Sequence, residues 1–176
     1  FSSCYRGHTE STDVIRTDYQ TLCSKTGAAS QLLFVFPPYA DAIPVPLLNF
    51  LKALEAHPPK SRPTVSVLIN CGFLEPRQNE MAVRMMRLFC RQNGYPFGSV
   101  LMIGGGEAIL DSPFRFLVAA KIRRFANSIA RREYGAFQVT MPLTKKMFVS
   151  AANTYWRNYG KKFGVTKDQM QTMQIE

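Results

Sequence analysis

Three short apolar runs along the chain predict buried β-strands. They lie at 31–36 (QLLFVF), 64–70 (TVSVLIN) and 99–103 (SVLMI). None of them alternates strictly between apolar and polar residues, and this is typical of strands covered on both faces of a parallel sheet. We therefore expect a parallel sheet at the core of the protein.

Segments with helical spacing separate these strands. Ile15, Tyr19 and Leu22 stand at i, i+4 and i+7 and predict a short helix ahead of the first strand. Four longer apolar stripes predict further helices, with inward positions at Leu47, Phe50, Leu51 and Leu54; at Met81, Ala82, Met85, Leu88 and Phe89; at Phe114, Val118, Ile122, Phe125 and Ile129; and at Phe148, Ala152, Tyr155, Tyr159 and Phe163.

The alternation of helices and strands predicts the fold class. It is the pattern of an α/β three-layer sandwich with a parallel sheet and right-handed crossovers. The 176 residues suit one domain over 1–176, with an irregular segment at 1–12. Three strands are few for such a sheet, so we expect it to lack a strand on its N-terminal side.

Composition narrows the class of protein. Hydrophobic residues make up 46% and charged residues 19% of the chain, as in folded globular proteins. The longest apolar run, 32–40, is far shorter than the ~20 residues that cross a bilayer. The four cysteines are widely spaced and form no metal-binding pairs, so we expect free thiols, a cytoplasmic location and no metal site: Cys4, Cys23, Cys71 and Cys90.

Positive charge is concentrated in the last third of the chain. Residues 111–176 hold twelve Lys or Arg against four Asp or Glu, within a net charge of +10. Such a basic face attracts anionic partners or is simply solvated. Because Phe114, Phe125, Tyr155 and Phe163 fall on inward stripes that the core is expected to cover, neither nucleic acid nor a membrane is expected as a partner.

Three segments follow the predicted strands and form the candidate site. They are 37–44 (PPYADAIP), 70–75 (NCGFLE) and 104–109 (GGGEAI). Ligands of open α/β sheets bind beyond the carboxyl ends of the strands, where these segments meet. Each is expected to offer free backbone amides and one acid, namely Asp41, Glu75 or Glu107. Taken singly, the prolines are better explained as the end of a strand and the start of a helix.

Several chemistries find no support in the sequence. The dinucleotide and P-loop glycine patterns and the G-x-S-x-G motif do not occur. The only histidines are His8 and His57, and no spacing supports a Cys71 nucleophile with His8 as its base. Catalytic residues are therefore left unassigned.

Two stretches carry a resemblance to a known family. Residues 34–51 (FVFPPYADAIPVPLLNFL), with their P-x-Y-x-x-x-x-P pattern, and 69–109, from INCGFLE to GGGEAI, resemble flavodoxin-like NAD(P)H-dependent FMN reductases. The resemblance covers most of the chain between about 13 and 164. It implies an oxidoreductase that binds FMN and takes electrons from NAD(P)H. It also implies that the flavin ring contacts Pro37, Pro38, Tyr39, Ala40, Asn70, Cys71, Gly72, Phe73 and Glu75.

The resemblance carries two further implications. Members of this family pair, so a homo-oligomer is expected, with the last helix, around Tyr155, Trp156 and Tyr159, as a candidate contact surface. The family binds the FMN phosphate with a Ser/Thr-rich loop after its first strand, whereas 1–13 (FSSCYRGHTESTD) resembles a later stretch. The chain is thus either a fragment or a diverged member that binds FMN weakly. The alternative function is a non-enzymatic module whose basic face binds an anionic partner.

Overall fold

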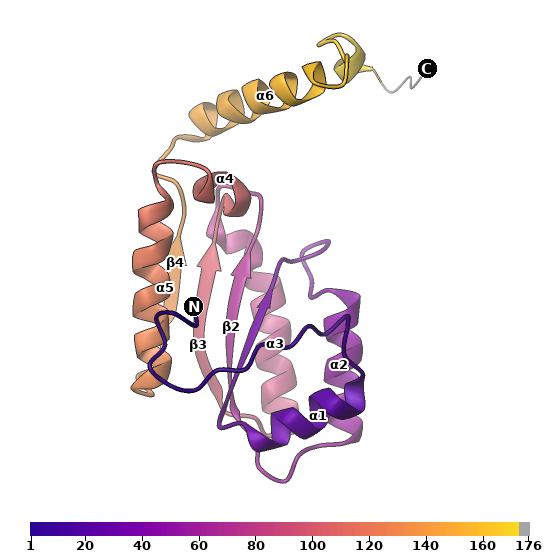
Figure 1. Ribbon diagram of the computed structural model, residues 1–176, viewed down its shortest axis with the longest axis vertical. Coiled ribbons are helices and arrows are strands. Elements are labelled where there is room, and N and C mark those ends of the chain that lie inside the picture. The colour runs from indigo at the N-terminus through magenta and orange to yellow at the C-terminus, as the bar shows by residue number, and fades with distance from the viewer. Residues whose placement is uncertain (173–176) are drawn as a thin grey trace. The chain divides into compact units, whose positions relative to one another are not determined.

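The computed structural model describes residues 1–172, and the chain forms two compact units that meet between Met141 and Pro142 (Figure 1). The first unit is an α/β structure with a four-stranded, all-parallel sheet flanked by helices. The second contains one long helix and a short 3-10 turn. Each unit is described separately below.

The strands of the first unit follow one another across the sheet in chain order. They are β1 (Gln31–Phe36), β2 (Thr64–Asn70), β3 (Phe97–Ile103) and β4 (Ala136–Val139). The three predicted strands are confirmed, whereas β4 was not predicted. The registers Asn70↔Ile103 and Ile103↔Val139 align the carboxyl ends of three strands at one edge. We call this the carboxyl edge of the sheet.

Local sequence sets where the helices begin and end. Asp18 caps the first helix, because its Oδ1 accepts from the backbone N–H of Thr21 at 2.8 Å. Ile15 therefore lies outside this helix and is exposed, which corrects its predicted place in the stripe. The helices of this unit are α1 (Tyr19–Ala28), α2 (Val45–Ala56), the 3-10 turn η1 (Pro76–Asn79), α3 (Glu80–Asn93), α4 (Gly106–Leu110) and α5 (Arg115–Ala130).

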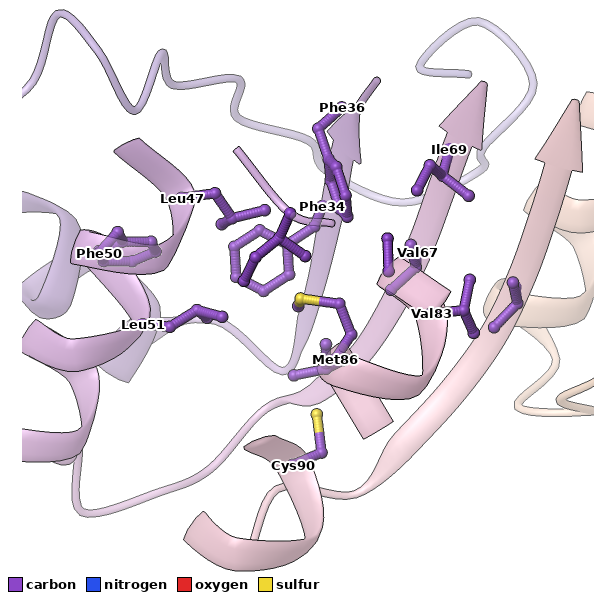
Figure 2. Packing of buried hydrophobic residues seen from close by; sticks show 14 of the residues in the cluster. Phe34, Phe36, Leu47, Phe50, Leu51, Val67, Ile69, Val83, Met86 and Cys90 are labelled. Atoms are coloured by element: carbon purple, nitrogen blue, oxygen red, sulfur yellow. The ribbon is translucent and has the colours of Figure 1, made fainter. Parts of the chain in front are cut away.

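The main core lies between one face of the sheet and helices α1, α2 and α3 (Figure 2). Phe34 and Val67 enter it from the strands, and Met86 enters it from α3. The predicted inward face of α3 is partly wrong, because Met81 and Leu88 are exposed. The residues of α3 that are buried instead are Ala82, Val83, Met86 and Cys90.

Helix α5 covers the opposite face of the sheet. Val100 belongs to the main core, so its neighbour Ser99 points the other way, and there the Ser99 hydroxyl meets that of Ser128 in α5 at 2.6 Å. The strands advance across the sheet in one direction, but α5 lies on the face opposite to α2 and α3. The connection through α5 therefore has the opposite hand to those through α2 and α3. The expected right-handed crossover is therefore wrong for this last connection.

The second unit contains α6 (Lys145–Lys161) and the 3-10 turn η2 (Gln169–Gln171). The Thr144 hydroxyl caps α6 by accepting from the backbone N–H of Met147 at 3.3 Å. The predicted helix is confirmed, but its predicted burial is wrong. Gly160 is its only buried residue, while the side chains of Tyr155, Trp156, Tyr159 and Phe163 are exposed. Within residues 1–172, no helix is both long enough and apolar enough to pass through a lipid bilayer.

A buried serine pair connects α5 to the sheet and generates the first prediction. The Ser99 hydroxyl also accepts from the backbone N–H of Gly135 at 3.3 Å, and Ser128 donates to the carbonyl of Phe125 at 2.8 Å. We expect Ser99→Ala to lower the free energy of unfolding by about 1–3 kcal/mol, because it removes the buried hydrogen bond to Ser128 and leaves the half-buried Gly135 N–H without this acceptor. Chemical denaturation of S99A, S128A and the double variant measures this.

The S99A/S128A double variant tests whether Ser99 and Ser128 act through one shared hydrogen bond. Its loss should be smaller than the sum of the two single losses, because both substitutions remove the same hydrogen bond. Ser150→Ala on the exposed face of α6 serves as the matched control and should change stability by less than about 0.5 kcal/mol. Fully additive losses from S99A and S128A would contradict the pairing.

Candidate functional site

A two-residue turn stands at the end of β1. Tyr39 and Ala42 exchange two backbone hydrogen bonds, N–H of Tyr39 to the Ala42 carbonyl at 3.0 Å and N–H of Ala42 to the Tyr39 carbonyl at 2.9 Å. The central residues Ala40 and Asp41 have φ angles of +46° and +61°. Both lie in the left-handed region that a type I′ turn requires and that glycine and asparagine prefer.

This turn holds an aromatic side chain away from the core. Tyr39 is 66% exposed although it follows the buried Phe36 by only three residues. Pro37 and Pro38 restrict the backbone before the turn, and Pro44 restricts it afterwards. The backbone at Tyr39 is therefore restricted, and its exposed ring at the carboxyl edge is available as a stacking surface for a planar ligand.

The exit of β2 is built around the buried Cys71. Its backbone N–H donates to the Ile103 carbonyl at 3.0 Å, and its thiol lies 3.6 Å from the Phe73 carbonyl. Burial raises the pKa of the Cys71 thiol, and the hydrogen bonds from this loop only partly offset that effect. Cys71 is thus a neutral packing group of the loop. The nucleophile considered from the sequence has no activating partner, because the described hydrogen bonds of its thiol involve only backbone carbonyls and Asn79.

Asn79 is the residue of this edge that the sequence did not reveal. It is fully buried, and its Nδ2 donates to the Ile103 carbonyl at 3.1 Å, to the Pro76 carbonyl at 3.0 Å and to the Cys71 thiol at 3.4 Å. The side chain therefore connects the loop after β2 to the end of β3. An asparagine directly before the acidic first turn of a helix was the only available signal, and it indicates a cap as readily as a clamp.

The three glycines after β3 are tightly packed. The N–H groups of Gly104, Gly105 and Gly106 donate to the carbonyls of Val139 (2.9 Å), Phe73 (2.6 Å) and Cys71 (2.9 Å). The expectation that this segment offers free amides is therefore wrong for the glycines, whereas the N–H groups of Glu107 and Ala108 have no acceptor within residues 1–172. Gly105 has a φ of +64°, and a Cβ on Gly104 or Gly106 would overlap the Leu74 carbonyl or the Asn70 side chain.

Free amides also exist at the other two exits. The backbone N–H groups of Ala40, Asp41, Gly72 and Phe73 donate to no acceptor within residues 1–172. Gly72 is exposed, and the Phe73 side chain is 59% exposed. These amides, together with the rings of Tyr39 and Phe73, are the groups that a ligand at this edge can reach.

The predicted site residues thus fall into two sets. Exposed at the carboxyl edge are Pro37, Tyr39, Ala40, Gly72 and Phe73, while Cys71 is buried and Pro38, Asn70 and Glu75 are half-buried. Asn70 and Phe73 contact the glycine segment, so two of the three exits meet directly. The third is adjacent through the pairing of Phe36 with Ile69.

Two hollows lie on the surface of the first unit. One of about 560 Å³ is lined by residues 110–113 and Arg115, and one of about 470 Å³ by residues of 14–19 and 45–49. None of the predicted site residues lines either hollow. Within residues 1–172, no group of His, Cys, Asp and Glu has the arrangement of a metal site, and Asp41, Glu75 and Glu107 form no ion pair.

The turn after β1 generates the second prediction. Placing Asn and Gly at its centre, as Ala40→Asn with Asp41→Gly, should raise the free energy of unfolding by about 1 kcal/mol, because these residues adopt positive φ at lower cost. Thermal unfolding measures the change. Ala42→Gly in the same turn is the control and should lower stability by about 0.5–1 kcal/mol, since Ala42 has no positive φ. Destabilisation by A40N/D41G would contradict the turn geometry.

The cysteines generate the third prediction. Burial raises the pKa of Cys90 to about 12 and also raises that of Cys71, so both stay protonated at pH 8. In the folded protein a thiolate-specific reagent should label Cys4 first, because its side chain is only half-buried, and should label Cys71 and Cys90 only after unfolding. Peptide mass spectrometry of the labelled protein assigns the sites. Labelling of Cys71 as fast as Cys4 would contradict its role as a packing group.

Comparison of the chain with protein-family models, with curated proteins and with solved structures found no match. What this edge binds must therefore follow from its own rings, amides and charges.

Proposed function

We propose that the carboxyl edge binds the isoalloxazine ring of FMN, in a flavodoxin-like oxidoreductase that passes electrons from NAD(P)H to an acceptor. One observation carries the proposal. Two exposed aromatic residues, Tyr39 on a closed turn and Phe73, stand at the carboxyl edge of a parallel sheet beside backbone amides without acceptors. This is where open α/β sheets bind their ligands.

The chemistry of these groups suits a flavin ring. An isoalloxazine is flat and largely apolar, with carbonyls and nitrogens along one edge. The ring of Tyr39 supplies a stacking surface, and the amides of Gly72 and Phe73 supply donors for the polar edge. Because the turn at Ala40 and Asp41 is already formed, little ordering entropy is lost when a ring stacks on Tyr39.

The FMN phosphate fits this edge poorly. The amides of Gly104–Gly106, the natural anchor for an anion, are engaged with carbonyls of the protein. Glu80 and Glu107 stand in the first turns of α3 and α4, and their negative carboxylates would repel a phosphate bound there. Within residues 1–172, the carboxyl edge therefore matches the ring of FMN and does not match its phosphate.

The division of chemical labour follows from this fit. A bound flavin would accept and donate the hydride, because amino-acid side chains do not carry out this chemistry themselves. The chain holds the ring, keeps one face of it on Tyr39 and donates hydrogen bonds to its edge. No acid–base pair of this chain is needed for that role, in agreement with the exposed positions of His8 and His57.

Flavin titration is the fourth prediction. The fluorescence of riboflavin and of FMN should be quenched by the full chain with affinities within about threefold of each other, because the phosphate gains no charge-assisted contact. Tyr39→Ala should weaken both by about tenfold through the loss of stacking, whereas Tyr39→Phe should not. The absence of quenching by the wild-type chain would refute the proposal.

A matched control separates stacking at this edge from general effects. Tyr134 lies at the other end of the sheet, where its hydroxyl accepts from Gln31 Nε2 at 3.0 Å, and Tyr134→Ala should leave flavin affinity unchanged. Added NADH or NADPH should then be oxidised only by the flavin-loaded chain. FMN binding at least tenfold tighter than riboflavin would show that a phosphate anchor exists after all.

A second function is favoured by one specific observation. The aromatic side chains of α6 are exposed among lysines and arginines, and the sequence argument against an anionic partner rested on their burial. The non-enzymatic alternative, a module that binds such a partner, is therefore kept. Retention on heparin that salt abolishes would support it, and its absence would remove it.

A further inference from the structure

Four aromatic residues of the second unit form a continuous exposed surface, which we call the aromatic stripe. Tyr155, Trp156, Tyr159 and Phe163 are 59%, 55%, 44% and 67% exposed. Their rings contact one another, with centroids 5.2 Å apart for Tyr155–Trp156 and for Tyr159–Phe163, and 5.9 Å apart for Trp156–Tyr159. Exposed apolar surface of this size, rich in Trp and Tyr, marks an interaction site.

The charge around the stripe has one sign. Residues 142–172 hold six Lys or Arg against one acid, Asp168, and none of these charges forms an ion pair within the described chain. By helical spacing, Lys162 lies on the side of Tyr155, and Lys145 lies on the side of Trp156. The partner of the stripe must therefore be apolar and acidic.

The carboxyl edge of the first unit has these properties. Its apolar side chains Tyr39, Phe73 and Leu110 are 66%, 59% and 55% exposed. Its segments 37–46, 70–80 and 104–115 hold five acids against two arginines, although the first unit as a whole is basic. Four of these acids form no ion pair within residues 1–172: Asp41, Glu75, Glu107 and Asp111. We call this surface the acidic edge.

We propose that the aromatic stripe of one copy of the chain docks on the acidic edge of a second copy, and that the exchange is reciprocal. Apolar surface and opposite charge match between the two. Pairing of α6 with α6 would instead bring like charges together. The segment between the buried Met141 and α6 is only Pro142–Thr144, and a short hinge favours exchange between copies.

The contact is large enough for a stable dimer. Aromatic side chains bury roughly 150–250 Å² each when covered, so at these exposures two reciprocal stripes remove roughly 900 Å² from water. With an equal area from the opposing edges, the total reaches the range of about 1,200–2,000 Å² found for specific interfaces. The inference stands on the surfaces of the chain and does not depend on flavin binding.

Charge exchange between copies is the test. Lys145→Glu with Lys162→Glu reverses the helix side, and Glu107→Lys with Asp111→Lys reverses the edge side. In sedimentation velocity at micromolar concentration the wild-type chain should be a dimer, and each variant alone should dimerise at least about tenfold more weakly. An equimolar mixture should recover the wild-type dimer, because both of its contacts then pair opposite charges.

Controls make either outcome informative. Arg123→Glu with Arg124→Glu, on the exposed side of α5, changes charge equally and should leave the dimer intact. Emission of Trp156, the only tryptophan, should shift to shorter wavelength as the dimer forms and return in the separate variants. A monomer at all concentrations, a mixture that stays monomeric, or a Trp156 shift seen only with anionic vesicles or DNA would overturn the proposal. Flavin quenching without a dimer, or a dimer without flavin quenching, would distinguish failure of this proposal from failure of the proposed function.

Discussion

The close contact between the glycines after β3 and the loop after β2 is the constraint on which the carboxyl edge depends. Gly104–Gly106 carry no side chains and each donates an N–H to a neighbouring carbonyl, so three backbone segments lie together, with no room for a Cβ at Gly104 or Gly106. Asn79 reinforces this contact from below by donating to the end of β3. The amides that fix the edge are thereby lost to any ligand. Recognition must instead come from the groups left outside, chiefly Tyr39 and the amides of Gly72 and Phe73.

Strong, long-range patterns of the sequence predicted the sheet correctly, and weak ones failed. The runs at 31–36 and 64–70 are mostly apolar, contain no charged residue and leave little choice except a buried strand. Strand β4 has only four residues, of which Val139 alone is buried, so its apolar signal is too short to separate from a loop. Its place depends on pairing with β3, which is a tertiary contact. The inward face of α3 was misjudged for a related reason, because Met81 and Val83 are both apolar and only packing decides which one is buried.

The candidate site shows the same limit at finer scale. Prolines around Tyr39 indicate a stiff connection, but residues such as Ala40 and Asp41 give no sign of a turn that normally takes Asn and Gly. Three successive glycines indicate either free amides or close backbone contact, and the sequence alone does not separate these. In α6 the periodicity identifies an apolar face correctly. It does not say what covers that face, so burial was inferred for Tyr155 and Tyr159, which are in fact exposed.

Both proposals rely on Tyr39 and Phe73, and this has a thermodynamic consequence. A flavin ring that stacks on Tyr39 removes part of the surface available to the aromatic stripe of a second copy, unless the ring is itself covered by that stripe. In the first case each partner lowers the affinity of the chain for the other, and in the second case each raises it. The factor is the same in both directions, because linkage between two binding events is reciprocal. The turn makes either coupling direct, since Ala40 and Asp41 keep the backbone of Tyr39 at the same place for both partners. The positive φ angles of Ala40 and Asp41 lower the stability of the turn locally. In return, the surface around Tyr39 is already formed before the flavin or the second copy binds.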